Sequence, residues 1–266
     1  MELTYSGYLQ VDKLLSLQDL RSYEPANDEL LFIIIHQAYE LWFKQVLHEI
    51  DQLIHLLGAG DISRIPHKLK RIRTIFKVLA HQWDILETMT PDDFLRFRTK
   101  LGTASGFQSF QFRELEFVLG YKRNQMLSIF KDDPPAHKRL THRLSQPSLW
   151  DAFLIFLDSA GYPIPQNRLG KTTDTPTEPN ADIQDVLLRI YRDNLTLRDI
   201  CESLVDIDEG IQEWRYHHVK MVERTLGGKP GTGGSSGTDY LRKTLFKPFF
   251  PDLWAIRSQF VDANES

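Results

Sequence analysis

The hydrophobic pattern of this chain is helical from near its start to near its end. Apolar side chains recur three and four positions apart over long stretches, which is the spacing of one buried helix face. No segment alternates apolar and polar positions as a half-buried strand does, and we find no internal repeat. The pattern predicts helices over residues 29–57, 65–87, 92–101, 107–119, 147–157, 183–195 and 200–224. The sequence therefore predicts an all-α helical bundle whose interior could house a flat cofactor.

The first long predicted helix carries an aromatic face that includes a histidine. This face consists of Phe32, His36, Tyr39 and Phe43. Their spacing of four, three and four positions puts them on one side of the helix. A histidine between aromatic rings can form the wall of a pocket for an aromatic ligand. The alternative is a core histidine that is hydrogen-bonded to a neighbour.

A second candidate pair lies in the predicted helix over residues 92–101. Phe94 and Arg98 are four positions apart, so they share a face of that helix. The planar guanidinium of an arginine beside aromatic rings can hold a carboxylate with two hydrogen bonds. Such an arginine can equally pair with a structural acid.

A histidine-bearing helix runs directly into a glycine-rich segment near the end of the chain. Adjacent helical residues point about 100° apart, so His217 and His218 cannot both reach one metal from one side. The glycines at 227 and 228 predict the end of the helix. The segment over residues 227–238 could fold over a bound molecule as a lid, or it could be a flexible surface linker.

Composition narrows the class of protein only a little. Of 266 residues, 41% are hydrophobic and 26% are charged, as in ordinary globular proteins. The net charge of −4 gives no electrostatic reason to expect nucleic acid or an anionic membrane as partner. The single cysteine, Cys201, excludes disulfides within the chain and multi-cysteine metal sites. The start has no signal-peptide pattern and no apolar run has membrane-spanning length, so we expect a cytoplasmic protein.

We expect one domain over residues 1–266. Within it, residues 1–20 form an aromatic arm, residues 166–182 a polar surface loop and residues 227–238 the glycine-rich segment. The sequence has no Glu-x-x-His, His-Glu-x-x-His or Gly-x-Ser-x-Gly motif, and no Gly-x-Gly-x-x-Gly after a strand. What remains is an aromatic helical pocket with isolated histidines on separate helices. Such a pocket suits haem, which needs one axial imidazole and an apolar slot.

Six segments, in order along the chain, closely resemble the tryptophan 2,3-dioxygenase family of haem enzymes. They are residues 31–44, 85–91, 97–98, 105–109, 214–219 (Trp-Arg-Tyr-His-His-Val) and 231–237 (Gly-Thr-Gly-Gly-Ser-Ser-Gly). The resemblance implies that His218, rather than His217, is the axial ligand of the iron of haem b. It also implies that Trp83, Ser105 and Gly106 line the haem pocket.

The resemblance implies roles for further residues around the substrate. His36 is expected to be the catalytic distal histidine near the indole nitrogen, and Arg98 to grip the substrate carboxylate. Thr232 is expected to close over the amino-acid end of the substrate, and Tyr5 to reach the site of a neighbouring subunit. The substrate-binding residues implied in this way are Tyr5, Phe32, Ile33, Ile34, Ile35, His36, Phe94, Arg98 and Thr232.

The expected activity follows from the same resemblance. A ferrous haem enzyme of this family inserts O2 across the indole C2–C3 bond of L-tryptophan and gives N-formyl-L-kynurenine, the first step of tryptophan catabolism by the kynurenine pathway. The expected assembly is a homotetramer, a dimer of dimers. Two alternatives stay open: a related haem enzyme acting on another indole or aromatic amino acid, and a non-catalytic haem sensor.

Overall fold

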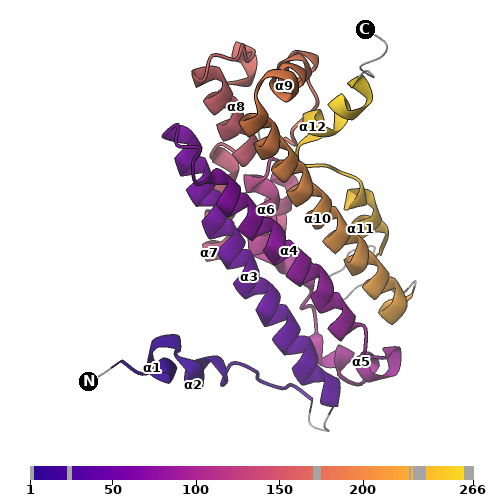
Figure 1. Cartoon of the computed structure of the whole chain (residues 1–266). Coiled ribbons are helices and arrows are strands. Elements are labelled where there is room, and N and C mark those ends of the chain that lie inside the picture. The colour runs from indigo at the N-terminus through magenta and orange to yellow at the C-terminus, as the bar shows by residue number, and fades with distance from the viewer. Residues whose placement is uncertain (1–2, 23–25, 170–174, 228, 230–237, 261–266) are drawn as a thin grey trace.

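Three long helices lie side by side and form the centre of the molecule (Figure 1). Helix α4 (Ile65–Leu86) lies between α3 (Asn27–Gly58) and α10 (Leu195–Leu226), and its contact with α10 is the most extensive. The computed structural model describes residues 3–22, 26–169, 175–227, 229 and 238–260, with the backbone alone for residues 238–240. Within these ranges every regular element is helical, which confirms the all-α prediction.

Shorter helices surround the three long ones. Helices α6 and α8 pack on α3, helices α9 and α11 pack on α10, and α5 touches both α3 and α10. In the described part of the chain, no helix combines the length and apolarity that a membrane span requires. The bounds are α1 Tyr5–Leu9, α2 Val11–Leu14, α5 Pro91–Arg98, η1 Thr99–Leu101, η2 Gly106–Gln108, α6 Phe110–Val118, η3 Asn124–Phe130, α7 Pro134–Ser145, α8 Leu149–Ser159, η4 Gln166–Arg168, α9 Ala181–Asp193, α11 Thr238–Leu245, α12 Pro251–Ala255 and η5 Ile256–Gln259.

Apolar side chains from the long helices form one continuous core. Ile50 of α3, Leu79 of α4 and Ile207 of α10 are almost completely buried. Burial of each such side chain contributes about 1.5–3 kcal/mol. Gly210 of α10 faces Phe76 of α4, and a Cβ at this position would lie 3.5 Å from the Cβ of Phe76, which is an ordinary van der Waals contact. The core therefore fixes α10 against α4 along most of its length.

The capping residues and a proline determine where α5, the helix that carries Arg98, begins. Thr90 caps its first turn by accepting a hydrogen bond from the backbone N–H of Asp93, and the Asp93 side chain accepts one from the backbone N–H of Thr90. Pro91 occupies the first helical position, where a missing N–H has no cost. The predicted helix over residues 92–101 is therefore α5 followed by the short η1.

The predicted boundary between the last two helices is wrong. The sequence pattern predicts helices over 183–195 and 200–224, whereas the chain turns at Asn194 and then continues without a break for 32 residues. The Asn194 side chain accepts a hydrogen bond of 3.1 Å from the N–H of Leu197 and so starts α10 immediately after α9 ends. Polar positions 198 and 199 interrupt the apolar pattern without interrupting the helix.

Two further segments differ from their predictions. The predicted helix over 107–119 is interrupted at Ser109, whose extended backbone and hydroxyl start α6. Helix α7 has no counterpart among the helices that the sequence pattern predicts. Asp133 in fact caps α7 through the N–H of Ala136, with Pro134 in its first turn.

The N-terminal arm leaves the bundle and lies apart from it (Figure 1). Its α1 and α2 bury no side chain, and most of its apolar residues are exposed. A hydrogen bond of 2.7 Å from Gln18 to Gln37 attaches the C-terminal end of the arm to α3. The described part of the predicted surface loop includes η4 and is attached to the bundle by Thr177, whose N–H donates to the carbonyl of Gly120 at 3.0 Å.

Candidate active site

A cavity of about 200 Å³ lies between α3, α4, α5 and α10, with η2, α6 and α11 on its remaining sides. Its wall is mostly apolar and aromatic. Eight of the residues predicted from the sequence line this single cavity: Phe32, His36, Trp83, Phe94, Arg98, Ser105, Gly106 and His218. The structure thus brings together side chains from segments that are far apart in the sequence.

His218 of α10 lines the cavity. Its ring lies almost parallel to that of Trp83, with 5.0 Å between centroids and 10° between planes. Burial, with smaller contributions from the charges of His36 and Arg113, lowers the pKa of His218 to about 4, so the imidazole is neutral near pH 7. Among the described residues, neither ring nitrogen of His218 has a hydrogen-bond partner. A neutral imidazole in this position is a suitable metal ligand.

The neighbouring His217 is placed differently. It does not line the cavity, and its ring packs edge-on against Tyr216 with 5.9 Å between centroids. This arrangement follows from the helical geometry of α10, because successive side chains point in different directions. Of the two adjacent histidines, only His218 is therefore directed toward the candidate site.

His36 also faces the cavity, from α3. Its Nδ1 lies 2.7 Å from the carbonyl oxygen of Phe32. Because a carbonyl only accepts, Nδ1 carries the proton and Nε2 is a hydrogen-bond acceptor in the neutral ring. Burial lowers the pKa of His36, although the bond to Phe32 and the charge of Glu40 act in the opposite direction. His36 can therefore accept a hydrogen bond from a ligand N–H.

Aromatic rings surround the space between His36 and Arg98. The Phe32 ring lies 4.1 Å from the His36 ring, 5.9 Å from Phe94 and 5.4 Å from Phe97, measured between centroids. Arg98 is the last residue of α5 and lines the same space. The arrangement offers an apolar slot with an acceptor on one wall and a guanidinium on another.

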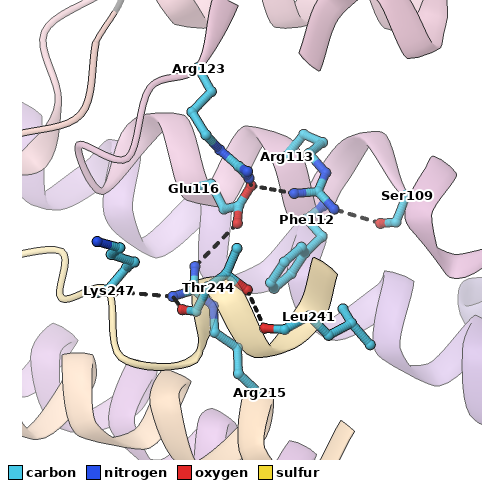
Figure 2. Close-up of polar contacts among 9 residues, drawn as sticks. All are labelled: Ser109, Phe112, Arg113, Glu116, Arg123, Arg215, Leu241, Thr244 and Lys247. Atoms are coloured by element: carbon cyan, nitrogen blue, oxygen red, sulfur yellow. Dashed lines mark hydrogen bonds and ion pairs between the residues drawn. The ribbon is translucent and has the colours of Figure 1, made fainter. Parts of the chain in front are cut away.

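A buried ion-pair cluster behind the cavity was not predicted. In this Glu116 cluster the carboxylate of Glu116 contacts Arg113 at 2.5 Å, Arg123 at 2.6 Å and Arg215 at 3.1 Å (Figure 2). All four side chains are buried. Burial alone would raise the pKa of Glu116, but the three guanidiniums lower it below its usual value. Three arginines against one carboxylate leave an excess of two positive charges, and Arg113 and Arg215 line the cavity.

Several predicted residues are not part of the cavity wall. Ile33, Ile34 and Ile35 follow Phe32 on α3 but do not line the cavity; Ile34 is 46% exposed, whereas Ile35 is in the core. Tyr5 is 78% exposed on α1. Thr232, with most of the glycine-rich segment, lies outside the described residues.

The fold and the cavity define an all-helical protein with a buried, aromatic-walled ligand site and two neutral histidines on different helices. The family model for tryptophan 2,3-dioxygenase matches residues 1–153 and 179–260 of the chain. The tryptophan 2,3-dioxygenase of Herpetosiphon aurantiacus is 56% identical over 256 residues, which are 96% of this chain and 98% of that relative. Those of Anaeromyxobacter sp. and Myxococcus xanthus are 49% identical over 259 residues and 44% identical over 261 residues. They cover 96% and 97% of this chain and 95% and 90% of the relatives.

The chain belongs to the tryptophan 2,3-dioxygenase family, as its sequence motifs predict. The family is haem-dependent.

Proposed function

We propose that this chain is a haem-dependent dioxygenase that inserts both atoms of O2 across the indole C2–C3 bond of L-tryptophan and forms N-formyl-L-kynurenine. One observation carries the proposal: His36, Arg98 and His218, from three helices, line the same aromatic cavity. The full-length similarity to relatives named tryptophan 2,3-dioxygenase supports the same reaction.

The chemistry of the cavity wall supports a b-type haem with His218 as the ligand of its iron. This imidazole is neutral, and no hydrogen bond to a described residue competes for its ring nitrogens. The two excess positive charges of the Glu116 cluster suit a macrocycle that carries two carboxylates. When bound, ferrous haem supplies the iron centre at which O2 is activated. Trp83, Ser105 and Gly106 would contact the macrocycle from the cavity wall.

The remaining residues would bind and orient L-tryptophan. Phe32 and Phe94 would enclose the indole ring, and Nε2 of His36 would accept the indole N–H. The Arg98 guanidinium would hold the carboxylate through two parallel hydrogen bonds. Thr232 and the rest of residues 227–238 would contact the amino-acid end and exclude water from the site.

We also propose that the chain acts in the cytoplasm as a homotetramer in which Tyr5 reaches the site of a neighbouring subunit. The exposed apolar surface of the arm supports this assembly. It includes Leu3, Tyr5, Tyr8, Leu9, Leu14, Leu15, Leu17 and Leu20. So many exposed large apolar side chains on one short segment are typical of a segment that packs on a partner chain.

The decisive experiment is an anaerobic titration of the reduced, haem-loaded protein with L-tryptophan, followed by admission of air. We expect a shift of the Soret band and then the ultraviolet absorbance of N-formylkynurenine. A haem spectrum that does not respond to L-tryptophan would instead support a relative with another substrate. Absence of a Soret band after expression with ample haem would refute the haem proposal.

A further inference from the structure

Arg215 lies one turn before His218 on α10 and links three elements. One terminal nitrogen donates to the carbonyl oxygens of Thr244 at 3.1 Å and Lys247 at 3.2 Å, at the end of α11 and just beyond it. The other terminal nitrogen donates to Glu116 of α6 at 3.1 Å. Figure 2 shows the guanidinium between the α11 carbonyls on one side and Glu116 on the other. A single buried side chain thus joins α10, α6 and the end of α11.

This contact has a clear physical basis. The last carbonyls of a helix have no partner within it, and they carry a partial negative charge. One of these carbonyls, that of Thr244, accepts hydrogen bonds from the Arg215 guanidinium and from the N–H of Lys247, while the Phe249 ring packs against the guanidinium with its centroid at 4.7 Å. Glu116 compensates part of the charge of the buried guanidinium. The planar guanidinium fixes all three partners in direction as well as distance.

The position of α11 matters because this helix forms part of the cavity wall. Leu241 and Thr244 of α11 line the cavity together with His218 of α10. A shift of α11 along α10 would therefore change the shape of the site without moving His218. The contact between Arg215 and the carbonyl oxygens of Thr244 and Lys247 opposes such a shift.

We infer that Arg215 and Glu116 are a positioning pair, which fixes α11 against α10 and so sets the shape of the cavity next to His218. Neither residue takes part in the reaction step itself, although Arg215 lines the cavity. Where the inference concerns tryptophan binding it rests on the proposed function, whereas the attachment of α11 does not.

The test compares Glu116→Gln with Glu114→Gln in the haem-loaded protein. Glu114 is the matched control, because it lies two positions earlier on α6, is equally buried, and is bound by Arg139 and Arg143 at 2.6 and 2.9 Å. We expect amide hydrogens over residues 241–250 to exchange roughly tenfold faster in the Glu116 variant and not in the control. We also expect the Kd for L-tryptophan, measured by Soret titration, to rise roughly three- to tenfold in the Glu116 variant alone.

Arg215 variants give a second measurement. Arg215→Met should have the same two effects. In Arg215→Lys both effects should be smaller but still present, because one ammonium reproduces the contacts of the planar guanidinium only in part. Equal acceleration of exchange in the Glu114 and Glu116 variants would overturn the inference, since it would indicate general destabilisation. Faster exchange over residues 241–250 with an unchanged Kd for L-tryptophan would refute the inference that the pair sets the shape of the cavity. If the wild-type protein binds no tryptophan, the proposed function fails, but the exchange data still decide whether the pair holds α11.

Discussion

The imidazole of His218 lies against the indole of Trp83, with 5.0 Å between ring centroids and 10° between ring planes. The two residues come from α10 and α4, the helices with the most extensive mutual contact. A ring that is packed flat against another has less freedom to rotate about its Cβ–Cγ bond. Trp83 thus sets the orientation of the histidine that we propose binds the haem iron.

Replacement of Trp83 by Leu should therefore affect both stability and haem binding. We expect the free energy of unfolding to fall by about 2–4 kcal/mol, as for other large losses of buried volume. We expect haem affinity to fall about tenfold because the imidazole is less well oriented. Haem transfer to apomyoglobin would measure the change. Trp150→Leu is the control, since Trp150 is equally buried but packs against Phe153 and Phe250, away from the cavity. Equal loss of haem affinity in the two variants would contradict the role of Trp83.

Replacement of His218 by Ala should abolish haem retention, because the cavity would lose the proposed axial ligand. His217→Ala should retain haem, since His217 does not line the cavity. The ratio of Soret to protein absorbance after purification measures both. Full haem content in the His218 variant, or loss of haem from the His217 variant alone, would show that the ligand is assigned to the wrong residue.

Replacement of Arg98 by Ala should weaken binding of L-tryptophan. Loss of hydrogen bonds to a charged group typically costs about 1.5–3 kcal/mol, which corresponds to a rise in KM of roughly 10–100-fold. Arg96→Ala is the matched control on the same helix, because Arg96 is exposed and pairs with the neighbouring Asp92 at 3.1 Å. Steady-state kinetics should show a normal KM for that control. An unchanged KM in the Arg98 variant would count against its contact with the substrate carboxylate.

Asp252 provides a prediction about pH and stability. Burial raises the pKa of this carboxyl, although hydrogen bonds from Asn180 and Gln184 act against the rise. Its second oxygen is buried and has no partner among the described residues. A carboxyl with a raised pKa binds more protons in the folded state than in the unfolded state. The protein therefore loses stability as the pH rises from near 4 through the raised pKa.

Asp252→Asn removes this dependence on pH. The advantage of the variant in melting temperature over the wild type should grow with pH above about 4 and then level off. Thermal melts at a series of pH values measure this difference. A constant difference at all pH values would show that Asp252 does not titrate as its surroundings indicate.

The sequence is sufficient to pair residues that share a helix. Phe32 with His36 and Phe94 with Arg98 are neighbours through local helical geometry, and the structure puts each pair in the cavity wall. The meeting of α3, α5 and α10 cannot be read from spacing within any one of them. The family motifs do predict that these helices meet at one site, because similar sequences share a tertiary arrangement.

The Glu116 cluster shows what spacing and motifs both miss. Arg113, Arg123 and Arg215 are 3, 7 and 99 residues from Glu116, so its most distant contact depends on how α10 packs on α6. Helix α7, in contrast, could have been predicted. Asp133 and Pro134 form an ordinary helix start, but the apolar face that follows is narrow and buries only Ala136, Leu140 and Leu144.

Because α10 is unbroken, binding of the proposed haem at His218 would be coupled to the folding of the whole helix. Its first half is held in the core, where Asp208 accepts hydrogen bonds from the N–H groups of Phe249 and Phe250, and its second half carries Trp214 and His218. A ligand that binds only the ordered second half stabilises the whole helix by mass action. Substitutions that destabilise the fold far from the cavity should therefore first lower the haem occupancy of the purified protein. Growth with added haem should restore part of the lost yield of folded protein.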